Sequence, residues 1–275
     1  MQPLEIVKLT PRSNCQACGF PSCLAFAAAV AKTGFAPGRC PFLDPNALAP
    51  LLGAPQAEDL DHLAEKKELL FIAHLKSKIS QLDFATLAPR LGARWFATHP
   101  DTLSFSYLGQ EAAIDKAGIL LAGQPPRDHR DQILLYNYLA MGGGTPPGGE
   151  WLGLESLPNT ISKVKTLATY GEERLAHLFH EQGEERAAAI GRQLGARFIS
   201  EPNAALEMIV PVLPLVPHYL LYWPEEAADG FPAKVKILFD RRVLDFLDVE
   251  SLVFAAERLA DRFCELARAL PGSNS

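Results

Sequence analysis

The hydrophobic residues of the chain follow a helical period in some segments and an alternating period in others. Large apolar residues recur every three or four positions over about 58–82, 129–141, 175–194 and 248–269, which is the spacing of one buried helical face. In the last of these, the residues expected to point inward are Leu252, Ala256, Leu259, Phe263 and Ala267. A further helical stretch is predicted to begin at Trp151.

Strand-like segments lie between these helices and are densest after residue 195. Leu103, Phe105 and Tyr107 alternate with polar residues, and the apolar pattern resumes over 113–121 after a Gly109-Gln110 break, which predicts a hairpin. Strands are also expected over 196–199, 208–213, 218–223 and 234–240. The prolines among them favour edge strands or a bent, short-stranded sheet.

This order of elements predicts the α+β class, because helices and strands are neither strictly alternating nor fully segregated. The Pro- and Gly-containing stretch 47–55 is a candidate linker. We therefore expect two parts, a small module over residues 1–50 and a mixed α+β domain over residues 57–270.

Composition and charge agree with a folded chain in two dissimilar parts. Of 275 residues 48% are hydrophobic and 21% charged, which is far from the signature of disorder. Residues 1–50 hold four Lys or Arg against two Asp or Glu, whereas the remainder holds 22 against 30. The net charge of -6 argues against a nucleic-acid partner. No apolar run is long enough for a membrane span and no secretory signal is visible, so we expect a cytoplasmic protein.

Four of the five cysteines fall within 26 residues, in the pattern Cys-x2-Cys-x4-Cys-x16-Cys-Pro formed by Cys15, Cys18, Cys23 and Cys40. Clustered cysteines in a reducing compartment more often hold a metal than form disulfides. Three cysteines in nine residues, followed by a distant fourth, favour an iron-sulfur cubane over the paired hairpins of a zinc site, although zinc stays open. Ser22 and Gly34 predict a helix over 23–33, whose positive end would face an anionic cluster.

These residues resemble a known module. Residues 9–27, closed by Cys40-Pro41, are similar to the four-cysteine [4Fe-4S] domain of the corrinoid iron-sulfur protein large subunit and of the Rnf complex B subunit. The resemblance implies a low-potential [4Fe-4S] cluster, anaerobic metabolism, and a redox partner protein that depends on a corrinoid. Residues 150–159 and the terminal strand, strand, helix order resemble an uncharacterised bacterial domain found behind such modules in anaerobes, which brings no catalytic residues.

The larger segment offers no clear catalytic group, so enzyme activity is left open and its catalytic residues stay unknown. The Gly-rich stretch 142–149 follows a helix and lacks a phosphate-loop lysine, so we expect a loop. His177 and His180 are expected to be ordinary surface, and Cys264 a buried thiol. An acidic turn around Glu225 and Glu226 is a weak candidate docking surface.

Three function classes follow from this sequence. The preferred one is electron transfer to a partner, with reductive activation of a corrinoid protein as a specific form. The second is a redox or oxygen sensor that signals by cluster loss, and the third is a metal-stabilised scaffold without electron transfer. An enzyme with its own substrate pocket in the second domain is a weaker fourth class.

Overall fold

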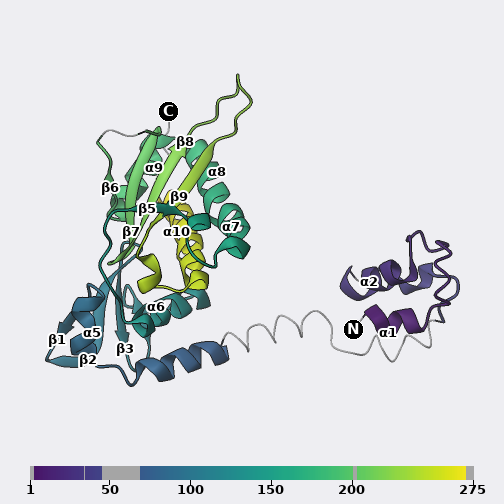
Figure 1. Cartoon of the computed structure of the whole chain (residues 1–275), viewed down its shortest axis with the longest axis horizontal. Helices are drawn as coiled ribbons and strands as arrows, with labels where there is room; N and C mark the ends of the chain where they lie inside the picture. The colour runs from purple at the N-terminus through teal and green to yellow at the C-terminus, as the bar shows by residue number, and fades with distance from the viewer. Residues whose placement is uncertain (1–2, 34, 45–68, 201–202, 271–275) are drawn as a thin grey trace. The chain divides into compact units, whose positions relative to one another are not determined.

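The computed structural model describes residues 3–33, 35–44, 69–200 and 203–270, and it divides the chain into two compact units, Met1–Leu69 and Leu70–Ser275 (Figure 1). The expected linker at 47–55 and the first part of the expected helix 58–82 lie outside the described residues. Residues 69–79 are helical. The boundaries 1–50 and 57–270 remain a prediction.

The first unit contains α1 (Pro3–Lys8), α2 (Cys23–Thr33) and the short 3-10 helix η1 (Pro37–Arg39). The predicted helix over 23–33 is confirmed. The core of the first unit is a set of six buried residues from both α-helices and the segment after η1, namely Ile6, Phe26, Ala27, Val30, Cys40 and Leu43. Phe20, Phe26 and Phe35 meet edge to face, with ring centroids 5.0 to 6.4 Å apart.

The second unit begins with a four-stranded antiparallel sheet that follows α5 (Phe84–Arg90). Its strands, in the order β1-β2-β3-β4, are β1 (Arg94–Phe96), β2 (His99–Tyr107), β3 (Gln110–Asp115) and β4 (Ile119–Leu121). The predicted hairpin is β2 and β3, with Tyr107 paired with Gln110. The expected second strand is split after Asp115, because its carboxylate accepts hydrogen bonds from the N–H groups of Ala117 and Gly118 and closes a turn.

A five-stranded antiparallel sheet follows, in the order β5-β9-β8-β7-β6. Its strands are β5 (Trp151–Gly153), β6 (Arg197–Phe198), β7 (Leu206–Leu213), β8 (Val216–Trp223) and β9 (Lys234–Asp240). One expectation was wrong, because Trp151 begins a strand, not a helix, and residues 151–153 pair with β9. Of the two alternatives for the prolines, edge strands are excluded for Pro211 and Pro217, which lie in the inner strands β7 and β8. The pairing register shifts at Pro211, where a donor is missing.

Helices cover this sheet and connect it to the first one. They are α6 (His129–Met141), α7 (Ile161–Leu167), the π-helical segment η3 (Ala168–Glu172), α8 (Glu173–Gln182), α9 (Glu184–Gln193) and α10 (Val249–Ala269), with 3-10 turns η2 (Leu154–Ser156) and η4 (Val243–Asp245). The predicted helices 129–141 and 248–269 are confirmed. The long helix expected over 175–194 is two, because Gly183 has φ +79° and turns the chain between α8 and α9.

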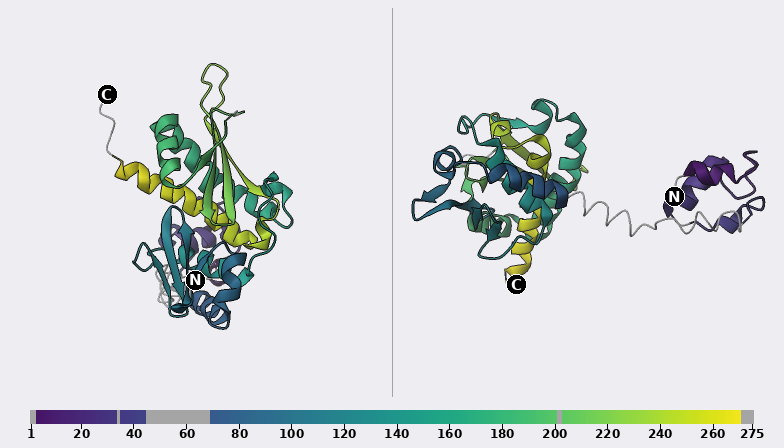
Figure 2. Two further views of the ribbon diagram at one scale, coloured as in Figure 1. Left: turned by 90° about the vertical axis from the view of Figure 1, so that its left-hand side faces the viewer. Right: turned by 90° about the horizontal axis from the view of Figure 1, so that it is seen from below.

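The layers of the second unit are visible where α10, the yellow helix, runs along the five-stranded sheet (Figure 2). Phe179 of α8 contacts Tyr222 of β8 and Phe263 of α10, with centroid distances of 5.5 and 5.2 Å. All five residues expected on the inner face of α10 are buried. The unit is a mixed helix and sheet domain, so the predicted α+β class is confirmed.

Candidate metal centre

The four amino-terminal cysteines lie on three different parts of the first unit. Cys15 and Cys18 are in the loop between α1 and α2, Cys23 is the first residue of α2, and Cys40 follows η1. All four are free thiols, with Cys15 exposed, Cys18 and Cys23 half-buried, and Cys40 buried at 6% relative exposure. The donor set is therefore four unoxidised sulfurs on one small unit, which is the soft set that iron-sulfur clusters and zinc both accept.

The start of α2 is fixed by side chains of the loop that precedes it. The side-chain oxygen of Asn14 accepts a hydrogen bond from the backbone N–H of Cys23 at 2.9 Å. The Ser22 hydroxyl oxygen accepts another from the N–H of Ala25 at 3.1 Å, as expected for a helix cap. The Asn14 contact connects the residue before Cys15 to the backbone of Cys23, so two predicted ligand segments are held together by one hydrogen bond.

The backbone of the loop has an unusual conformation around the first two cysteines. Arg12, Asn14 and Gln16 have positive φ angles of 55°, 50° and 60°, and Gly19 follows at 84°. Residues in this region cost energy unless they are glycine, so three of them at alternate positions indicate a backbone selected for its shape. Loops with such residues occur in backbone sites that bind anions, including iron-sulfur sites.

The thiols differ in their surroundings. A hydrogen bond from the backbone N–H of Ala17, with a smaller contribution from the Ser13 side chain, lowers the pKa of Cys15 and favours its thiolate. Cys40 instead belongs to the apolar core, and Cys18 packs against that core. The unit thus presents one accessible thiol and holds another within its hydrophobic interior.

The structure does not gather these thiols into a single coordination geometry. Among the residues it describes, no group of three or more His, Cys, Asp or Glu side chains could hold one metal ion. The four cysteines are grouped by their spacing and by the small unit that they share. The donor chemistry of Cys15, Cys18, Cys23 and Cys40 fits an iron-sulfur cluster.

The other cysteine and the candidate histidines lie in the second unit. Cys264 is half-buried on α10 and lines a pocket, so the expectation of a buried thiol was wrong. His177 and His180 are exposed, and each pairs with a carboxylate, Glu181 at 3.3 Å and Glu225 at 3.4 Å. They are ordinary polar surface, as expected.

An ion-pair network in the second unit was missed by sequence reasoning. Asp131, in the first turn of α6, is 3% exposed and accepts hydrogen bonds from Tyr107 at 2.6 Å and Arg258 at 2.8 Å. Burial and the Asp131 charge raise the pKa of Tyr107 well above its ordinary value, so the phenol stays a donor. Asp261 joins Arg130, Arg174 and Arg258 across three helices. The network fixes α6, α8 and α10 to one another.

Family models match a part of each unit. The model of the family described as "Domain of unknown function (DUF3786)" matches residues 83–262, more than half of the chain. A model described as "Putative Fe-S cluster" matches residues 11–42, which include all four amino-terminal cysteines. Searches of curated proteins and of solved structures found no match. In the described part of the chain, no helix combines the length and apolar content needed to cross a bilayer.

Proposed function

We propose that this chain, which belongs to the family described as a domain of unknown function (DUF3786), transfers single electrons through a [4Fe-4S] cluster on its amino-terminal unit. The proposed ligands are Cys15, Cys18, Cys23 and Cys40. When bound, a cluster of this type supplies a one-electron redox couple. The family matches support an iron-sulfur module joined to an uncharacterised domain, without giving the cluster type or an electron-transfer role.

The main observation in favour of electron transfer is the exposure of Cys15. A ligand thiol that is exposed at the surface, in the loop between α1 and α2, leaves a cluster edge within reach of a docked protein. The hydrogen bond from the Ala17 N–H that lowers the pKa of Cys15 favours its thiolate, the form that binds iron. Hydrogen bonds and positive charge near sulfur raise the reduction potential, whereas thiolate charge lowers it.

The partner assigned by this proposal is a redox protein, and the resemblance of residues 9–27 to corrinoid-associated modules favours one whose corrinoid must be reduced before it can react. The DUF3786 domain then serves as the part of the chain that selects this partner. Its large core and charged surface suit a stable docking platform, and its described residues contain no metal-binding group of three or more ligands.

The decisive experiment is anaerobic purification of the full chain followed by redox titration. We expect about four iron and four sulfide per chain, a reduced-cubane electron-spin signal after dithionite, and recovery of the oxidised spectrum on reoxidation. Alanine at any of the four proposed ligands should remove the cluster, whereas the matched variant Cys264→Ala should retain it. One zinc per chain, or equal sensitivity at position 264, would reject the ligand set and the cofactor.

A sensor function is the second candidate, because the same exposure of Cys15 gives oxidants access to a ligand. The two functions differ in reversibility. Electron transfer predicts cycling without iron loss, whereas a sensor predicts that air exposure releases iron and changes the fold of the first unit. A cluster that cannot be reduced even at very negative potential would favour the sensor or the metal-stabilised scaffold.

A further inference from the structure

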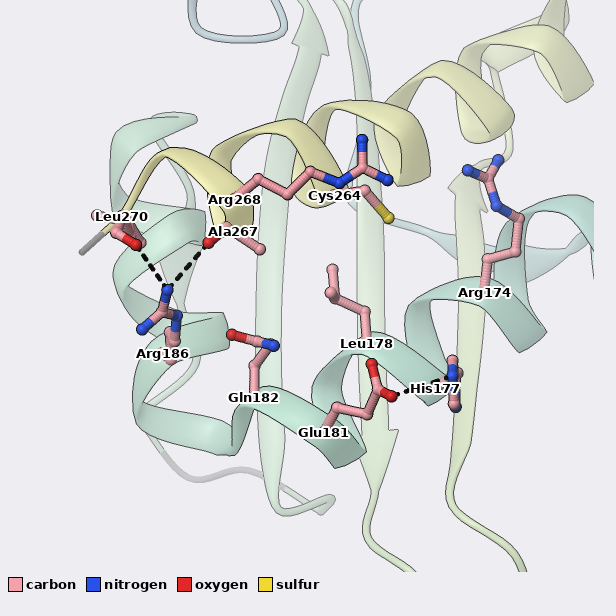
Figure 3. A pocket seen from close by; sticks show the side chains of 10 residues that line it. All are labelled: Arg174, His177, Leu178, Glu181, Gln182, Arg186, Cys264, Ala267, Arg268 and Leu270. Atoms are coloured by element: carbon pink, nitrogen blue, oxygen red, sulfur yellow. Dashed lines mark hydrogen bonds and ion pairs between the residues drawn. The ribbon is translucent and has the colours of Figure 1, made fainter. Parts of the chain in front are cut away.

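A pocket of about 490 Å³ lies in the second unit between α8, the first turn of α9 and the carboxyl-terminal turns of α10 (Figure 3). Its volume is within the range of small-molecule sites, which are roughly 300 to 1,000 Å³. No residue of the proposed metal centre contributes to it. The family match assigns no ligand to this domain.

Arginines are concentrated around the pocket although the surrounding unit is acidic. Arg174, Arg186 and Arg268 line it together with the exposed His177, against a single lining carboxylate, Glu181. Residues after position 50 hold only 22 Lys or Arg for 30 Asp or Glu, so three arginines around one concavity are a local reversal of the charge of the unit. A concave cationic wall concentrates anions.

The three arginines of the pocket differ in whether their side chains are already paired within the protein. Arg174 is paired with Asp261 at 2.7 Å, and Arg186 donates to the carbonyl oxygens of Ala267 and Leu270 at 2.9 Å each, so both hold the walls in place. Arg268 is exposed and forms no hydrogen bond or ion pair within the described residues, and its side chain extends along α10 (Figure 3). Its guanidinium is thus available as a two-pronged donor for a carboxylate or phosphate.

The rest of the lining is apolar or neutral. Leu178 and Ala267 are buried, and half-buried Cys264 lies on the same side of α10 as Arg268, one helical turn earlier. An occupant that uses the whole pocket therefore needs an apolar body as well as a charged group. Glu181 lies 3.3 Å from His177 and disfavours a ligand with several negative charges crowded at that end.

We propose that this pocket binds a small organic anion, with its carboxylate or phosphate on Arg268 and its apolar body against Leu178 and Ala267. This site is separate from the metal centre, and its occupation does not require a cluster.

The test uses three ring compounds that differ only in the attached group, benzoate, phenyl phosphate and the neutral benzyl alcohol, titrated into the full chain by calorimetry. We expect at least one anion to bind. The alcohol should bind about tenfold more weakly or not at all, because it lacks the charged group that accepts hydrogen bonds from the arginine. Preference between benzoate and phenyl phosphate identifies the head group. Equal binding of the alcohol, or no binding of either anion, overturns the proposal.

Two further measurements locate the site. Arg268→Gln should weaken the anion about tenfold and Arg268→Lys less, whereas Arg197→Gln removes the same charge from an exposed arginine outside the pocket and should leave affinity unchanged. Bound anion should also slow alkylation of Cys264, read by mass spectrometry of its peptide. An unchanged Arg268→Gln affinity, or unprotected Cys264 at saturating anion, would place binding elsewhere and reject this pocket.

Discussion

The two units of this chain differ in what their cores are made of. Within the described residues, the first unit buries six hydrophobic residues, one of which is Cys40, a proposed ligand. The second unit buries a continuous cluster drawn from both sheets and from helices α5 to α10, and none of its buried core residues is a cysteine.

This difference teaches that the two units need different sources of stability. A chain of fewer than about 40 to 50 residues buries too little apolar surface to fold firmly alone, and metals commonly supply the rest. In the first unit the proposed ligands are also structural residues, because Cys40 and Cys18 pack in the same core that a cluster would complete. In the second unit we expect stability to be independent of the metal, because no buried core residue is a cysteine.

Removal of a cluster ligand is expected to have the largest effect, and to be confined to one unit. Cys18→Ala should abolish cluster binding and the slow hydrogen exchange of α2, because metal binding and folding are coupled in so small a unit. The backbone amides of the second unit should stay protected from hydrogen exchange. The control variant Cys264→Ala should leave the amides of the second unit equally protected. Loss of protection in both units would show that they share one cooperative core. A fragment beginning near residue 57 tests the same independence and should unfold cooperatively.

Truncation of a core aromatic residue in the second unit should destabilise that unit and leave the cluster of the first unit intact. Phe263 is fully buried on α10 and contacts Phe179, so Phe263→Ala should lower the free energy of unfolding of the second unit by about 3 to 5 kcal/mol. Denaturant titration measures this, and iron content per chain should be unchanged. A parallel loss of iron would contradict the separation of the two units.

Acid should destabilise the second unit through one histidine. His218 of β8 is fully buried, neither ring nitrogen has a hydrogen-bond partner in the described residues, and burial lowers its pKa to about 4. Its folded pKa is below the unfolded value of 6.5, so the neutral form stabilises the fold above pH 6.5 and this contribution is lost as pH falls toward 4. The loss is about 3 kcal/mol.

The measurement is unfolding free energy against pH for the wild type and His218→Phe, which keeps a ring against Phe239. The difference between the two curves should be constant above pH 7 and should shift by about 3 kcal/mol in favour of the variant by pH 4. Parallel curves would show that His218 takes up its proton equally in the folded and unfolded protein, and so that burial does not lower its pKa.

The smallest expected effect lies at the start of α2. Asn14→Gly removes the hydrogen bond to Cys23 but tolerates the positive φ, so it should destabilise the first unit by about 1 kcal/mol. Asn14→Ala should cost more, because alanine also resists that φ. Both should release iron to a chelator faster than the wild type. Equal rates for all three proteins would show that this contact does not position Cys23.

Sequence reasoning identified the parts of this protein whose structure is decided locally. Helices α2, α6 and α10 have the predicted bounds, because Ser22, Asp128 and Asp248 cap them and their apolar residues keep one period. The cysteine spacing likewise indicated the cluster module that the family comparison supports. These features depend on neighbours within a few residues, which a sequence displays directly.

Tertiary structure decided the rest, since it depends on partners that are distant in the chain. Trp151 became a strand residue because Asp240, 89 positions later, pairs with it in the sheet. Asp131 is the buried partner of Arg258, 127 positions later, and the pocket of Arg268 exists only because α8, α9 and α10 meet. Backbone pairing and charge burial are set by three-dimensional neighbours, and no local pattern of residues specifies which distant segment will supply them.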